Sequence, residues 1–207
     1  DAYGHGLVAV AKALQADAPA FAVAVLDEAL ELRQAGISVP LLILEGVSSV
    51  DQIELAAAKE LSLVVHSEEQ VSLLQRANPS VPVSIWLKVD TGMHRLGVRP
   101  AQVETLLGGL QDCACEVAVI CTHFACADDL SSDVTNNQLA AFAACSSDLD
   151  IAKSIANSAG ILAWPQSHAD WNRPGYLLYG VSPLADDVES ARGLKPAMSL
   201  RSEIIAI

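Results

Sequence analysis

The sequence has no long apolar run and little positive charge. Its 207 residues include 12 lysines and arginines against 25 aspartates and glutamates, a net charge of −13. Nucleic-acid binding needs clustered basic side chains that displace counterions, so this balance argues against a nucleic-acid partner. A membrane-spanning helix needs about 18 or more consecutive apolar residues, and charged side chains such as Lys12 and Asp17 interrupt the most apolar region, residues 7–30. We therefore expect neither a nucleic-acid nor a membrane partner.

A regular cysteine framework is also lacking. The five cysteines are an odd number without regular spacing, which suits a reducing compartment and predicts a cytoplasmic protein. Cys121, His123 and Cys126 lie close together along the chain, but their spacing does not match the paired ligands of a structural zinc site. We expect no metal.

Short apolar runs alternate with helical stretches along most of the chain. The runs are nearly continuous in apolar residues, which is typical of parallel strands buried on both faces. Ser67 and Gln70 have the spacing of a capping box, and Gly36 is placed to end a helix. Strands are predicted at residues 21–26, 41–44, 61–65, 83–88, 117–121, 151–156 and 171–173, and helices at 7–16, 28–35, 50–59, 68–77, 101–110 and 137–145.

The order and number of these elements favour a barrel. The chain begins on a loop that leads directly into a helix, so a strand before residue 1 is implied in addition to the seven predicted ones. Eight strand–helix units indicate a (β/α)8 TIM-type barrel, an α/β fold, rather than a doubly wound sheet. Residues 197–207 alternate apolar and polar side chains, as an antiparallel strand does. We expect a barrel domain at 1–196, lacking its first strand, and the first strand of an incomplete C-terminal β domain at 197–207.

A basic motif follows the strand predicted at 83–88. Residues 87–97 read Leu-Lys-Val-Asp-Thr-Gly-Met-His-Arg-Leu-Gly. Lys88 closes an apolar strand, where a lysine is desolvated and needs partners. Arg95 lies on the loop beyond it, and a guanidinium can bind a carboxylate by two parallel hydrogen bonds. The alternative is a capped loop with two solvated cations.

Three further polar segments follow strands near the end of the chain. His123 comes after the strand at 117–121, although a single histidine there is more often structural. The loops after the last two predicted strands, 156–160 and 171–176, occupy the usual phosphate site of such barrels. Ser158 offers a hydroxyl, Gly175 a close backbone approach and Tyr176 an amide. The alternative is two ordinary turns.

Taken together, these segments resemble the alanine racemases, pyridoxal-phosphate enzymes of fold type III. Residues 1–6, Asp-Ala-Tyr-Gly-His-Gly, are similar to the second half of the family's cofactor-lysine motif, Lys-Ala-(Asp or Asn)-Ala-Tyr-Gly-His-Gly, which places that lysine two positions before Asp1. Residues 87–97 resemble the family's Leu-Lys-x-Asp-Thr-Gly-Met-x-Arg-Leu-Gly. Residues 156–159 and 173–175 resemble its Ala-Asn-Ser-Ala and Arg-(Pro or Phe)-Gly. Asn172 departs from the pattern, since an apolar residue is more usual there.

The resemblance implies roles for individual residues. Lys88, often carbamylated in the family, would hold Arg95, and Arg95 would reach the cofactor's phenolic oxygen and the substrate carboxylate. Arg173 would face the pyridine nitrogen, and His123 would support it from behind. Leu44 would pack on the ring, although it could equally be a core leucine. The remaining cofactor contacts would come from Tyr3, Asn157, Ser158, Gly175 and Tyr176.

The implied activity is interconversion of L- and D-alanine by two-base proton transfer on pyridoxal phosphate, which supplies D-alanine for peptidoglycan. One base would be the Schiff-base lysine before Asp1, and the other a tyrosine from the partner subunit of a homodimer. Two alternatives stay open. A non-catalytic pyridoxal-phosphate-binding barrel would end without the strand beyond residue 197. A fold-type-III amino-acid decarboxylase would have to expel the carboxylate that Arg95 would bind.

Overall fold

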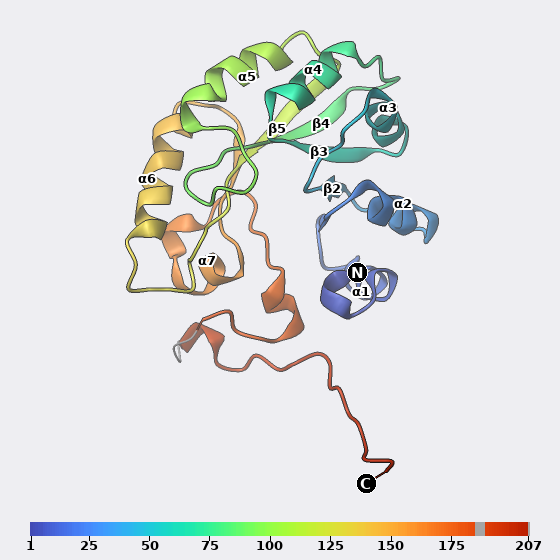
Figure 1. Cartoon of the computed structure of the whole chain (residues 1–207), viewed down its shortest axis with the longest axis vertical. Coiled ribbons are helices and arrows are strands. Elements are labelled where there is room, and N and C mark those ends of the chain that lie inside the picture. The colour runs from blue at the N-terminus through green and yellow to red at the C-terminus, as the bar shows by residue number, and fades with distance from the viewer. Residues whose placement is uncertain (185–188, 207) are drawn as a thin grey trace.

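A curled parallel sheet forms the centre of the molecule, with helices around its outside (Figure 1). The computed structural model describes residues 1–184 and 189–206. Neighbouring strands follow one another in chain order and every pairing is parallel, as consecutive strand–helix units require. This confirms the predicted α/β barrel fold, of which the strands form a curled part. They are β1 (Phe21–Val23), β2 (Leu41–Ile43), β3 (Leu61–Val65), β4 (Val83–Lys88), β5 (Cys115–Cys121) and β6 (Ala152–Ser154).

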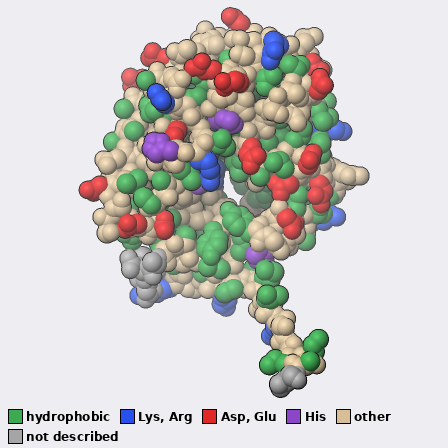
Figure 2. Space-filling view, in the orientation of Figure 1, with side chains coloured by type: hydrophobic (Ala, Val, Ile, Leu, Met, Phe, Trp, Pro, Cys, Tyr) green, Lys and Arg blue, Asp and Glu red, His purple; other side chains and the backbone are tan. Residues whose placement is uncertain are grey.

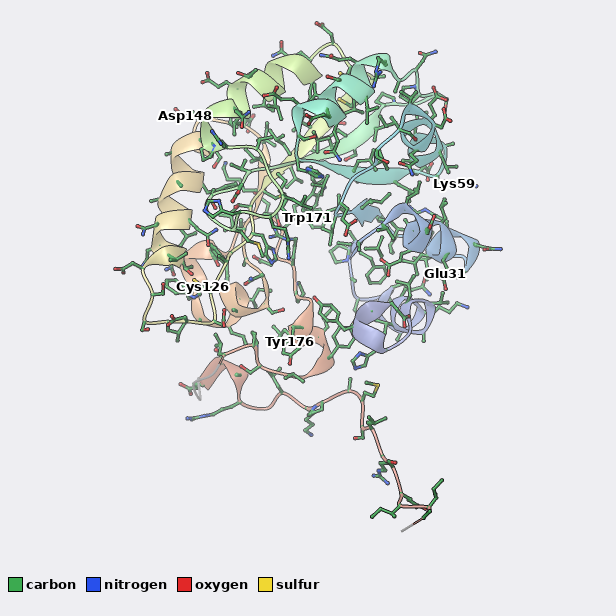
Figure 3. All side chains as sticks on the ribbon, viewed as in Figure 1. Glu31, Lys59, Cys126, Asp148, Trp171 and Tyr176 are labelled. Carbon is green, nitrogen blue, oxygen red and sulfur yellow. The ribbon has the colours of Figure 1, made fainter. Side chains whose placement is uncertain are left out.

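The strands are apolar because both faces of the sheet are covered. On one face, side chains such as Ile43, Leu63 and Ile85 belong to the large core shared with the helices. The opposite face carries a second cluster built around Trp86 and Cys121. Trp86 packs against Trp171, with ring centroids 5.7 Å apart, and Figure 3 shows Trp171 near the middle of the molecule. Full burial of one such apolar side chain stabilises the fold by about 1.5–3 kcal/mol.

Each predicted helix forms, with both ends within three residues of the predicted bounds, and a further helix at Ser158–Ala163 was not predicted. Ser67 Oγ accepts a hydrogen bond from Gln70 N, while Gln70 Oε1 accepts one from His66 N instead of completing the capping box. Gly36 follows α2 with φ of +85°, a left-handed conformation that glycine adopts readily. The helices are α1 (Leu7–Leu14), α2 (Leu26–Gln34), α3 (Val50–Ala58), α4 (Glu68–Arg76), α5 (Val103–Leu110), α6 (Val134–Ser146) and α7 (Ser158–Ala163), with short 3-10 turns such as η4 (Tyr176–Tyr179).

The strand predicted at 171–173 is reduced to one parallel bridge between Ser154 and Trp171. Trp171 N donates to Lys153 O as a ladder requires, but the Trp171 carbonyl accepts from the Ser154 hydroxyl. Arg173 N then donates to Ala156 O, and the Ile155 carbonyl accepts from the Arg173 guanidinium. Side-chain hydrogen bonds therefore take the place of the next backbone hydrogen bonds, and regular pairing between β6 and this segment stops at Trp171.

The segment after residue 197 extends away from the body (Figure 1). Residues 197–206 form no strand, and Leu200 and Ile205 are 96% and 97% exposed. A strand needs a partner for its backbone groups; Ala197 N donates to Tyr179 O, but no described residue pairs with the backbone of residues 198–206. Ile207 lies outside the described residues, and the β domain at 197–207 stays a prediction. No helix among residues 1–184 and 189–206 is long and apolar enough to cross a membrane.

Candidate functional site

A cavity of about 450 Å³ brings most of the predicted cofactor residues together. Figure 2 shows a hollow near the centre of the viewed face with basic side chains at its wall. Residues that follow β5 and β6 meet there with the N-terminal segment, as expected when parallel strands end on one edge. The cavity is lined by the predicted residues Tyr3, His123, Asn157, Ser158, Arg173, Gly175 and Tyr176, and by Asp128, Ala159, Ser182 and Pro183, which were not predicted as site residues.

Arg173 is fixed at the cavity wall by neutral acceptors. Its Nη1 donates to Ser154 Oγ at 2.5 Å, and its Nη2 donates to Thr122 O at 2.5 Å and to Ile155 O at 3.2 Å. Burial lowers the pKa of Arg173, with the neighbouring Cys121 thiol acting in the opposite direction. Among the described residues no carboxylate forms a salt bridge with it. A guanidinium so held is a fixed cation whose charge is available to a ligand in the cavity.

His123 stands beside this cation and is uncharged near neutral pH. Arg173 Nη2 lies 3.4 Å from His123 Nδ1. Burial, followed by the charges of Arg173, Lys88 and Arg95, lowers the pKa of His123 to about 3. Because the guanidinium can only donate, Nδ1 is the acceptor and the ring proton lies on Nε2. The sequence-based pairing of His123 with Arg173 is thus seen in the structure.

The other end of the cavity is lined by backbone amides. Ser158 Oγ accepts hydrogen bonds from Gly175 N at 3.0 Å and Leu177 N at 3.2 Å, which ties the start of α7 to η4. Asn157 Oδ1 caps α7 by accepting from Gly160 N at 2.9 Å. A Cβ at Gly175 would collide with the Tyr3 hydroxyl, so a side chain there would fill the space between them. This end of the cavity is therefore narrow and polar, and none of the residues just named contributes a carboxylate to it.

The basic loop after β4 is shaped by one carboxylate. Asp90 Oδ1 accepts from the amides of Gly92, Met93 and His94 at 2.9–3.0 Å. Lys88, at the end of β4, is partly buried, and burial together with the charges of Arg95 and Arg173 lowers its pKa, although Cys121 and Asp90 oppose this. Arg95 is exposed. The positive charges of Lys88 and Arg95 also lower the pKa of His123, so the loop and His123 belong to the same site.

Two predicted cofactor residues, Leu44 and Tyr3, make mainly apolar and aromatic contacts. Leu44 follows β2 and is partly buried against the second apolar cluster with Trp86. Tyr3 is 64% exposed and packs on Tyr176 and Tyr179, with ring centroids 6.4 and 5.2 Å away. Figure 3 shows Tyr176 below the middle of the molecule, with the C-terminal segment continuing beneath it.

Sequence reasoning missed the residues that hold Arg173. Thr122 and Ser154 are 1% and 0% exposed, and both accept from its guanidinium. Ser154 carried a signal, because a polar side chain that interrupts an apolar strand needs a partner when buried. Thr122 accepts through its main-chain carbonyl, which no side-chain pattern reveals.

Comparison with known proteins gives one consistent result. Residues 1–183 match the family described as Alanine racemase, N-terminal domain. The chain is 48% identical over 210 residues to the biosynthetic alanine racemase of Escherichia coli, covering 100% of this chain and 58% of that protein. It is 46% identical over 209 residues to the alanine racemase of Halorhodospira halophila, covering 100% of this chain and 57% of that protein. A crystal structure of biosynthetic alanine racemase from Pseudomonas aeruginosa superposes with a TM-score of 0.88 at 43% identity, over 95% of this chain and 55% of that one.

Proposed function

The chain belongs to the alanine racemase N-terminal domain family, and from this premise we propose that the protein containing it interconverts L- and D-alanine with pyridoxal phosphate. The chain spans about 57–58% of the length of its curated relatives, so this activity is that of a longer polypeptide. The observation that carries the proposal is the fixed Arg173–His123 pair facing the same cavity as Ser158 and Gly175.

The cavity fits the cofactor by charge and by shape. The Ser158–Gly175 end offers a hydroxyl and backbone amides where a phosphate could lie close to the main chain. Arg173 supplies a cation at the wall, and no carboxylate among the described residues forms a salt bridge with it, although Asp128 also lines the cavity. Asn157, Tyr3 and Tyr176 would complete the phosphate end, and Leu44 would pack on the ring. When bound, pyridoxal phosphate serves as the electron sink that makes the substrate's α-proton acidic.

Arg173 sets the electronic character of the site. Its guanidinium does not give up a proton near neutral pH. Facing the pyridine nitrogen, it would keep that nitrogen unprotonated and limit the stabilisation of negative charge. His123 holds the guanidinium in place through Nδ1.

Arg95 would bind the substrate carboxylate, and Lys88 would orient Arg95. The lowered pKa of Lys88 increases the fraction of neutral amine. That amine can add to carbon dioxide, forming an N–C bond and releasing one proton, which leaves a carbamate anion. An anion at Lys88 would accept hydrogen bonds from the guanidinium, where an ammonium would repel it.

The two proton-transferring bases would come from outside residues 1–207. His123 has a pKa of about 3, with Nδ1 engaged by Arg173, and is too weak a base for the reaction. We assign one base to a lysine two positions before Asp1 and the other to a tyrosine of a partner subunit. The same proposal includes a cytoplasmic homodimer, a β domain that begins near residue 197, and D-alanine supply for peptidoglycan.

The test uses the complete protein loaded with pyridoxal phosphate. Each alanine enantiomer is incubated in deuterium oxide, and the product is analysed by chiral chromatography and mass spectrometry. We expect the opposite enantiomer carrying deuterium at Cα. Basic amino acids are tested in parallel: release of carbon dioxide from one of them would favour the decarboxylase alternative, and cofactor binding without turnover of alanine or of these would favour the non-catalytic barrel.

A further inference from the structure

The side chain of Gln138, on α6, joins the loop after β4 to the segment after β5. It is 1% exposed. Its Nε2 donates to Thr91 Oγ1 at 3.2 Å and to His123 O at 3.0 Å, and its Oε1 accepts from Ala125 N at 2.9 Å. Both amide protons and the carbonyl oxygen are therefore engaged, and the contacts on either side fix the orientation of the amide.

The two connected segments carry the two cations of the proposed site. Thr91 Oγ1 also bonds Thr122 Oγ1, at 2.8 Å. Thr122 in turn receives the Arg173 guanidinium on its carbonyl. Arg95 lies four residues after Thr91 on the same loop. A continuous set of hydrogen bonds thus runs from the loop of Arg95, through Gln138 and the threonine pair, to Arg173.

The tip of the Arg95 loop rests on Gln138. The base of the loop is held by backbone bonds, Asp90 N to Val98 O at 2.8 Å and Val98 N to Lys88 O at 3.0 Å. A Cβ at Gly92 would lie 3.4 Å from Gln138 Cγ, so the main chain of the loop passes directly over the stem of this side chain. Asp90 shapes the loop from within, whereas Gln138 connects its tip to the neighbouring segment.

We propose that Gln138 is a positioning residue that sets the separation and orientation of Arg95 relative to Arg173 and His123. The inference rests on the proposed function for its catalytic consequence, but not for its structural part. If the two hydrogen bonds that Gln138 donates are lost, we expect the loop at residues 91–95 to loosen. The Ser158–Gly175 end of the cavity, which Gln138 does not contact, should stay unchanged.

Gln138→Glu is the sharpest variant because the shape is kept. The retained oxygen can still accept from Ala125 N, and Thr91 can rotate its hydroxyl to donate. The His123 carbonyl cannot donate, so it would face a carboxylate oxygen at the 3.0 Å position of the present amide nitrogen. Gln138→Met preserves the volume without a charge and is the second variant if the first does not fold.

Thr135→Val is a matched control on the same helix. Thr135 is also fully buried, one turn before Gln138, and its Oγ1 has no hydrogen-bond partner among the described residues. Replacing this hydroxyl by a methyl group keeps the shape and removes an unpaired polar atom. It therefore changes a buried polar side chain of α6 without breaking a hydrogen bond to the Arg95 loop.

The experiment is carried out on the complete protein, with amide hydrogen exchange, cofactor affinity and kinetics measured on the same samples. In both Gln138 variants we expect faster exchange at residues 91–95, unchanged pyridoxal phosphate affinity, and a fall of about tenfold or more in kcat/KM for alanine, mostly through kcat. Thr135→Val should match the wild type in all three.

Wild-type exchange rates at 91–95 in the Gln138 variants would overturn the proposal. So would a lower melting temperature with unchanged exchange and kinetics, which would leave Gln138 a packing residue. If the wild type does not racemise alanine, the proposed function fails, while the exchange comparison still decides whether Gln138 holds the loop.

Discussion

Arg173 Nη2 lies 3.4 Å from His123 Nδ1, at the wall of a cavity where no described carboxylate pairs with either group. A permanent cation this close to an imidazole disfavours a second positive charge, and burial acts in the same direction. The pair therefore has one stable charge state near neutral pH: a charged guanidinium and a neutral histidine that accepts from it.

Stability should rise with pH through the acidic range because of His123. Its pKa is about 3 in the folded protein against an ordinary 6.5, so between these values the unfolded chain binds more protons. The contribution to the unfolding free energy grows by up to about 1.4 kcal/mol per pH unit in that window and is constant above it. Urea unfolding between pH 4 and pH 8 should show a smaller pH dependence for His123→Gln than for the wild type. A similar flattening in the exposed-site variant His168→Gln would contradict the assignment.

Loss of the Ser158 hydroxyl should weaken cofactor binding. Ser158→Ala leaves the amides of Gly175 and Leu177 without their acceptor and removes a group from the proposed phosphate end. We expect a loss of about 1–3 kcal/mol in binding free energy, measured by cofactor titration. Ser147→Ala, at an exposed serine, is the control and should bind as the wild type. Equal cofactor affinities of Ser158→Ala and the wild type would show that the phosphate binds elsewhere.

Lys88 should form a carbamate, and the carbamate should disappear as pH falls. Burial and the nearby guanidinium groups lower the pKa of Lys88, so more of its amine is neutral and able to react with carbon dioxide. Acid protonates the amine and reverses the reaction. Carbon-13 NMR with labelled bicarbonate should show one carbamate signal that is absent in Lys88→Arg. A signal that persists in that variant would belong to another amine.

Arg95→Ala should lose transition-state stabilisation of about 2–4 kcal/mol in kcat/KM for alanine, because a charged hydrogen-bonding partner of the carboxylate is removed. Cofactor affinity should change less than kcat/KM. Arg99→Ala removes another exposed cation just beyond the loop and should retain wild-type kinetics. If Arg95→Ala did so too, Arg95 would have a structural role.

The sequence predicts those features that depend on local pattern. β3 and β4 match their predicted ranges because each is a nearly continuous apolar run that ends at or just before a polar or charged residue. β1 ends at Val23, earlier than predicted, because regular pairing with β2 stops there: Glu45 N donates to Ala24 O outside the strands, and α2 begins at Leu26. Gln138 could not be identified from the sequence, since its partners Thr91 and His123 are brought to it by the packing of α6. Side chains that connect separate segments leave no periodic signal in any one of them.

Arg173 offers a test of reaction choice, and the structure determines which substitution is informative. Arg173→Glu would place a carboxylate against the Thr122 and Ile155 carbonyls, which cannot donate to it, so a loss of folding would obscure the result. Arg173→Gln removes the cation and keeps an amide that can donate to these oxygens. Without the cation, protonation of the pyridine nitrogen becomes easier and the electron sink becomes stronger.

We therefore expect Arg173→Gln to racemise alanine more slowly and to transaminate it more often in each turnover. Pyridoxamine phosphate and pyruvate are measured against racemised alanine on the same sample, after cofactor affinity and thermal stability have been checked. Arg173→Lys keeps a cation and should stay nearer to the wild-type partition, because what matters in this account is the positive charge. An unchanged partition in Arg173→Gln, with cofactor bound and the fold intact, would show that the charge does not control the reaction. Arg173 would then serve to pack the segment after β6 against Thr122 and Ser154.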